Sequence, residues 1–114
     1  SDHRPLNIEL KQVEFDNATY GTIGLESAFG ALLTVINLEA TIELLTKGRE
    51  TFGMETPELK EGKPASLTLF EPETAYQFSM STIVSSSKNS IFLGKTLKGK
   101  VIGTIANNQL VLND

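Results

Sequence analysis

The spacing of hydrophobic positions changes along the chain near Pro57. Before it, apolar residues cluster at helical spacings, most densely over 26–36 (ESAFGALLTVI). This stretch is apolar on nearly every side, which predicts a helix buried on several sides. A second helix is predicted over 39–47, where Gly48 ends it, followed by a short helical turn at 49–52.

The first 25 residues carry weaker signals. Pro5 disfavours helix at the residue before it, so the chain is expected to start extended or turned. The side chain of Asn7 can accept a hydrogen bond from a first helical turn, and a helix is predicted behind it over 8–18. The glycines of 20–24 (YGTIG) predict a loop.

After Pro57 the apolar positions alternate with a period of two, which is typical of strands. Four short strands are predicted, over 65–70, 75–80, 101–105 and 109–112. Pro72 is expected to end the first of them, because proline cannot donate to a strand ladder. Asn107 and Asn108 predict a hairpin between the last two, and residues 89–100 are interpreted as turns. The result is a small, incomplete antiparallel sheet.

Composition narrows the class of protein. The chain has 114 residues, of which 39% are hydrophobic, and such a short chain is marginally stable unless it packs on something else. The net charge is −4, and the cations are scattered, which disfavours nucleic-acid binding. The loose group of Lys95, Lys98 and Lys100 is interpreted as solvated surface.

The absence of cysteine excludes disulfides, thiolate nucleophiles and Cys-based zinc sites, and is compatible with the cytoplasm. No apolar run approaches the roughly 20 residues that span a bilayer, and the polar start lacks the apolar region of a signal peptide. We therefore expect no membrane partner and a cytoplasmic location.

Several short motifs follow one another along the chain. They are Ser1-Asp2-His3-Arg4-Pro5, Tyr20-Gly21, Gly24-Leu25-Glu26-Ser27, Glu61-Gly62-Lys63-Pro64-Ala65-Ser66-Leu67-Thr68-Leu69-Phe70, and Ser87-Lys88-Asn89-Ser90 with Leu97-Lys98-Gly99-Lys100-Val101. In this order the chain resembles the C-terminal end of a dihydroorotase, a member of the amidohydrolase superfamily. One departure within the fourth motif is Ser66, where the family usually has Asp.

The resemblance implies a (β/α)₈ barrel, whose catalytic residues lie at the C-terminal ends of its strands, joined to a small β-sandwich. We therefore expect an α+β fragment. Residues 1–56 would supply the active-site loop and helices from the end of the barrel, and residues 57–114 part of an incomplete antiparallel β-sandwich. The family's metal-binding His-x-His lies upstream and is absent from these residues, so zinc is expected in the parent enzyme and not in the fragment.

The resemblance also assigns roles to residues. Asp2 matches the family's catalytic aspartate, which takes a proton from metal-activated water and passes it to the leaving nitrogen; it could also contact the metal. Tyr20 and Gly21 match a main-chain contact to the substrate ring, although an ordinary tight loop explains them equally well. His3 is interpreted as structural more readily than catalytic, and Glu26 as a structural residue at a helix start.

Leu6 departs from the family, which usually has a substrate-contacting His at this position. Leucine cannot donate a hydrogen bond. A guanidinium suits bidentate binding of a carboxylate, so we hypothesise that Arg4 binds the substrate carboxylate instead. The alternative is that Arg4 is a surface residue.

Three functions remain open. The first is a zinc-dependent parent enzyme of pyrimidine biosynthesis that interconverts N-carbamoyl-L-aspartate and dihydroorotate, with the N-terminal barrel as partner and the fragment alone inactive. The second is a non-catalytic, dihydroorotase-like regulatory or assembly subunit, and the third is a stand-alone binding module. Exposed strand edges and apolar patches predict that the isolated chain forms a homodimer or a swapped assembly.

Overall fold

The structure is a computed structural model, and it describes residues 2–113. Two residues of the predictions therefore lie outside the described residues. They are Ser1, which begins the first motif and the predicted domain 1–56, and Asp114, which ends the predicted domain 57–114. The elements of the described range are η1 (Ile8–Lys11), η2 (Phe15–Asn17), α1 (Ala28–Val35), α2 (Leu38–Thr46), α3 (Gly48–Thr51), β1 (Leu67–Gln77), β2 (Thr96–Ala106) and β3 (Gln109–Leu112). Both strand pairs are antiparallel, in the order β1-β2-β3. The α+β class with a small antiparallel sheet is confirmed.

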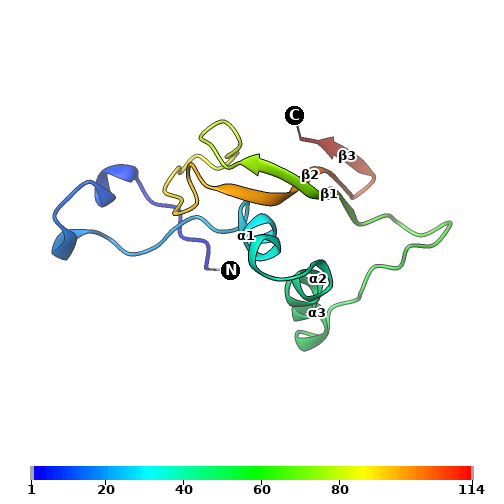
Figure 1. Ribbon diagram of the computed structural model, residues 1–114. Coiled ribbons are helices and arrows are strands. Elements are labelled where there is room, and N and C mark those ends of the chain that lie inside the picture. Colours follow the sequence, from blue (N-terminus) through cyan, green and yellow to red (C-terminus); the bar gives the residue numbers. More distant parts are fainter. Residues whose placement is uncertain (1, 114) are drawn as a thin grey trace.

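The arrangement is open (Figure 1). Helix α1 lies against the sheet, and the two 3₁₀ turns lie in an arm that extends to one side. The segment between α3 and β1 forms a loop that extends to the other side. None of the helices in the described range is long and apolar enough to cross a membrane.

The prediction of a continuous helix over 8–18 was wrong. Asn7 does cap, because its Oδ1 accepts a hydrogen bond from the Glu9 N–H at 3.2 Å. The helix nevertheless stops after one turn, since Gln12 leaves the helical region (φ −94°, ψ 43°). The apolar side chains of this stretch form no single stripe that packing could reward, and the second turn, η2, has no buried residue.

The predicted helices over 26–36 and 39–47 correspond to α1 and α2, with ends shifted by one or two residues. The side chain of Asn37 caps α2 by accepting from the Ala40 N–H at 2.8 Å. Burial of α1 on several sides was overestimated. Gly30 is buried, whereas Val35 is 76% exposed. One side of α1 therefore packs on the sheet, and its far side is open.

Two glycines allow α1 to approach the sheet closely. A Cβ on Gly30 would lie 2.6 Å from the Tyr76 hydroxyl oxygen, and one on Gly99 would lie 2.7 Å from a ring carbon of Phe29. Gly99 also has a φ of +80°, which favours glycine. Burial at this interface raises the pKa of the Tyr76 hydroxyl, because the ionised form loses solvation.

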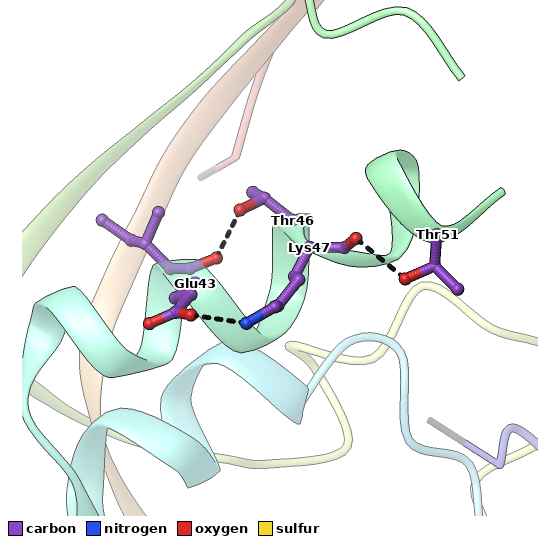
Figure 2. A network of polar contacts seen from close by, with 5 residues as sticks. Glu43, Thr46, Lys47 and Thr51 are labelled. Atoms are coloured by element: carbon purple, nitrogen blue, oxygen red, sulfur yellow. Dashed lines mark hydrogen bonds and ion pairs between the residues drawn. The ribbon is translucent and has the colours of Figure 1, made fainter. Parts of the chain in front are cut away.

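Helix α2 carries a small network of exposed polar side chains (Figure 2). Glu43 and Lys47 form an ion pair of 3.0 Å, and the Thr46 hydroxyl donates to a carbonyl one turn earlier at 2.8 Å. The Thr51 hydroxyl donates to the Lys47 carbonyl, which links α2 to α3. Helix α2 ends at Thr46, before Gly48, and the predicted helical turn at 49–52 corresponds to α3, with its ends shifted by one residue. Such an exposed ion pair contributes only about 0.3–0.5 kcal/mol.

Strand β1 runs through Pro72, so the prediction of two separate strands was wrong. Glu71 pairs with Lys100, and the next paired residue, Ala75, faces Lys98, so the ladder has an irregularity around Pro72. Because β1 is an edge strand, it tolerates a residue without an N–H at such a position.

Strand β2 begins at Thr96, five residues before the predicted strand, so residues 96–100 are strand and not turn. Leu97 is only 3% exposed and belongs to the core. The hairpin prediction is confirmed. Asn107 and Asn108 have φ values of 52° and 59°, which a two-residue type I′ turn requires at both positions.

The core is small for the length of the chain. Its buried apolar residues are Ile23, Phe78, Ile83 and Leu97, with Ala31, Tyr76 and Phe92 packed against them. The accessible surface is 8690 Å², about 2,600 Å² more than a compact monomer of this mass exposes. The radius of gyration is 16.2 Å, against about 13 Å for a compact domain of this length. Much apolar surface therefore has no partner within the described chain.

Part of that surface lines an open cleft of about 740 Å³ between the helices and the sheet. Ile42 and Leu45 of α2 form one wall. Phe70 of β1 and Val101 and Ile105 of β2 contribute to the opposite wall. Apolar side chains of α2 and of the sheet thus face an open cleft, whereas the layers of a globular domain normally pack against each other.

Candidate functional site

The predicted site residues lie on two segments, 2–6 and 20–24, which run next to each other. The Arg4 N–H donates to the Thr22 carbonyl at 2.9 Å. Gly21 has a φ of +118°, and a Cβ there would lie 2.7 Å from the Arg4 Cβ. The stem of Arg4 therefore covers Gly21 so closely that only glycine fits. The structure brings these two predicted residues together.

The other predicted residues are more open. Asp2 and Arg4 are exposed, and Tyr20 is 83% exposed. Leu6 is half-buried. The three groups proposed to meet substrate thus stand on a surface that is uncovered in this chain. Lys95, Lys98 and Lys100 are exposed, as expected for solvated surface.

His3 acts as a local anchor. Its Nδ1 accepts hydrogen bonds from the Gly24 N–H at 3.1 Å and the Leu25 N–H at 3.3 Å. This geometry assigns the neutral tautomer with the proton on Nε2. The imidazole therefore ties the start of the chain to the loop before α1, in line with the structural interpretation.

Glu26 also joins distant segments. Helix α1 starts at Ala28, so the carboxylate lies ahead of the helix and not at its first turn. It accepts hydrogen bonds from the Val84 N–H at 2.6 Å and the Ser85 N–H at 3.0 Å. Its role is structural, as expected, but it acts by holding the loop after β1.

Asn89 is the residue that sequence reasoning missed. Its side chain is buried between the two site segments, and the residue is only 5% exposed. Its Nδ2 donates to the Arg4 carbonyl at 2.9 Å and to the Gly21 carbonyl at 3.4 Å. Its Oδ1 accepts from the Leu6 N–H at 3.2 Å. The sequence offered only its place in the closing motif, because no local spacing predicts contacts across 68 to 85 residues.

No protein-family model matches the chain. Curated relatives, however, match over nearly its whole length. The dihydroorotase of Chlorobaculum tepidum is 36% identical over 119 residues, covering 98% of this chain and 27% of the relative. The dihydroorotase of Caldicellulosiruptor saccharolyticus is 36% identical and covers 100% of the chain and 28% of the relative. That of Bacillus cytotoxicus is 35% identical, covering 97% and 28%.

The chain belongs to the dihydroorotase family. It spans just over a quarter of the length of these relatives and corresponds to their C-terminal part. The relatives' name implies that the parent protein is a hydrolase.

Dihydroorotase membership raises the question of zinc. Zinc sites in proteins use about three or four protein ligands. Within residues 2–113, no three His, Asp or Glu side chains gather closely enough to hold a metal ion. The Nδ1 of His3 is already occupied by two backbone N–H groups. The described residues of this dihydroorotase segment therefore do not form a zinc site by themselves.

Proposed function

We propose that this chain is the part of a dihydroorotase that supplies a catalytic carboxylate, Asp2, and part of the substrate-binding surface. The parent enzyme interconverts N-carbamoyl-L-aspartate and dihydroorotate in pyrimidine biosynthesis, in the cytoplasm. The observation that carries the proposal is the match to several dihydroorotases over 97–100% of the chain.

In the hydrolytic direction, water adds to a ring carbonyl carbon of dihydroorotate and the ring C–N bond breaks. The Asp2 carboxylate accepts a proton from the attacking water and delivers it to the leaving nitrogen. Asp2 is exposed and lies two residues before Arg4, whose N–H bonds to the Thr22 carbonyl, and this placement supports the assignment.

Arg4 binds the substrate carboxylate through its guanidinium, which takes the place of the His that the family usually has at Leu6. The main chain at Tyr20 and Gly21 contacts the substrate ring. The close packing of the Arg4 stem on Gly21 supports both assignments, because it brings the two proposed binding positions together.

The zinc of the parent enzyme is held by residues outside this chain, since the described residues lack a ligand set. Most of the barrel of the parent enzyme is likewise formed by residues outside this chain. The chain exposes about 2,600 Å² more surface than a compact monomer of its mass, and large apolar side chains are among its exposed residues. We propose that the N-terminal part of the protein covers this surface. Alone, the chain is inactive and associates through its uncovered surface.

The test is turnover of dihydroorotate by the full-length protein. Asp2→Asn should lower kcat by about 100- to 10,000-fold, the usual contribution of a general base. Asp16→Asn, which changes an exposed carboxylate in η2, is the matched control and should leave kcat unchanged. An Asp2→Asn enzyme with wild-type kcat contradicts the role of Asp2.

Arg4→Ala separates binding from catalysis. Loss of a guanidinium that binds the substrate carboxylate should raise KM by about tenfold or more. An unchanged KM would show that Arg4 is a surface residue.

The second candidate is a non-catalytic, dihydroorotase-like subunit. Leu6 favours it, because this position lacks the hydrogen-bonding side chain that the resemblance leads us to expect. A folded full-length protein with no turnover, before any substitution, would select this alternative.

A further inference from the structure

We propose that Asn89 is a positioning residue of this site, which holds segment 2–6 and segment 20–24 in one fixed relation. The inference rests on the proposed function, because these segments carry Asp2, Arg4 and Gly21. Asn89 comes from the loop between β1 and β2, far along the chain from both segments. Figure 1 shows this loop, in yellow, beside the blue start of the chain.

The side chain of Asn89 meets both segments at once. Its amide group donates to the carbonyls of Arg4 and Gly21, one on each segment, and its Oδ1 accepts from the Leu6 N–H. Because the residue is buried, water does not readily replace these bonds. The carbonyls of Arg4 and Gly21 are thus both bonded to the Nδ2 group of Asn89.

The backbone of the same loop strengthens this connection. The Asn89 carbonyl accepts from the Ile23 N–H at 3.1 Å and from the Thr22 hydroxyl at 3.0 Å. The Thr22 oxygen in turn accepts from the Ile91 N–H at 3.1 Å. Segment 20–24 is therefore fastened directly to residues 89–91, while segment 2–6 depends on the Asn89 side chain for its bond to this loop.

Loss of the Nδ2 donors leaves two carbonyl oxygens facing a group that cannot bond to them. The Arg4–Thr22 and His3–Gly24 bonds still join the two segments. The spacing between the Arg4 and Gly21 carbonyls is no longer fixed, so Arg4 shifts relative to the backbone at Gly21. Misplacement of binding groups by about 1 Å costs up to 100-fold in turnover. Asn89 bonds to Arg4 and Gly21, which are the proposed substrate-binding positions. The effect should therefore fall mainly on KM.

The decisive variant is Asn89→Asp in the full-length protein. Aspartate keeps the size of the side chain and an acceptor for the Leu6 N–H, but it has no N–H to donate. We expect KM for dihydroorotate to rise about tenfold or more. Asn37→Ala is the control, because it also removes a bond from an Asn side chain to the backbone, at the N-terminus of α2. It should lower the melting temperature and leave KM unchanged.

Thr22→Val is the second variant, in case Asn89→Asp does not fold. It removes the hydroxyl that joins Asn89 and Ile91 and keeps the side-chain volume, so KM should rise about threefold. If wild-type turnover is present and KM is unchanged in each variant that folds, the positioning role is wrong and the proposed function stands.

A readout without activity separates the two proposals. Hydrogen exchange of the Arg4 amide, which bonds to the Thr22 carbonyl across the two segments, should accelerate about tenfold or more in Asn89→Asp. It should stay at the wild-type rate in Asn37→Ala. A wild-type protein without turnover contradicts the proposed function. Unchanged exchange in Asn89→Asp contradicts the positioning role whether or not the protein is active.

Discussion

The interface between α1 and the sheet and the paired segments 2–6 and 20–24 are held together by different interactions. The first rests mainly on apolar packing and on glycines that allow close approach, such as Gly30 and Gly99. One side-chain bond, from the Lys98 N–H to the Thr34 hydroxyl, also crosses this interface. The second rests on single polar side chains, those of His3 and Asn89, that bond to distant backbone. The difference teaches that stability and site geometry depend on separate residues in this chain.

The largest effect on stability is expected in the core. Leu97→Ala removes a side chain that is 3% exposed, and it should lower the free energy of unfolding by about 2–5 kcal/mol. Leu110→Ala, on the exposed strand β3, is the control and should change it by less than about 0.5 kcal/mol. Urea unfolding followed by circular dichroism measures both. Equal losses for the two variants would show that Leu97 does not belong to a packed core.

The His3→Ala variant should lose less stability than Leu97→Ala, but it should reduce the activity of the full-length enzyme. His3→Ala leaves the Gly24 and Leu25 amides without their acceptor, which should cost about 1 kcal/mol because water reaches them in part. In the full-length enzyme, kcat/KM should fall about tenfold as segment 2–6 loosens. Asn17→Ala, at an exposed residue of η2, should change neither. A wild-type value of kcat/KM in His3→Ala would show that site geometry does not depend on the His3 side chain.

The smallest effect is expected in alkaline solution at Tyr76. Burial raises the pKa of this hydroxyl, so the folded chain holds the proton to a higher pH than the unfolded chain does. The resulting stability is fully present below about pH 10 and is lost as pH rises through the folded pKa. Tyr76→Phe should remove this decline in melting temperature, and Tyr20→Phe should leave it in place. An identical alkaline decline in all three proteins would contradict the assignment.

The elements set by local pattern were predictable. The apolar cluster of α1, the helical spacing of apolar residues in α2 and the Asn107-Asn108 turn each act within a few residues, so the sequence displays them directly. Interruptions in a pattern were misjudged. Pro72 indicates a strand end, but the edge position of β1 and an irregular ladder accommodate it, and that depends on tertiary context.

The candidate site was predictable only in its residue types. Gly21 could be singled out by resemblance, and Arg4 by the chemistry of its guanidinium next to the departure at Leu6. The structure adds that Arg4 packs on Gly21. The long-range bonds of Asn89 and Glu26 could not be predicted, since a single polar residue forms no periodic signal and its partners lie up to 85 residues away. Such residues are visible only once the fold has brought the segments together.

The central claim is that this chain performs, within a dihydroorotase, the role of the matching C-terminal segment. The most direct test replaces the segment of the Chlorobaculum tepidum enzyme that aligns with this chain, 27% of that enzyme, with this chain and measures dihydroorotate turnover. We predict turnover in the folded chimera, and its loss by about 100-fold or more when Asp2→Asn is added. A folded chimera without turnover, or one that Asp2→Asn leaves unaffected, would contradict the account.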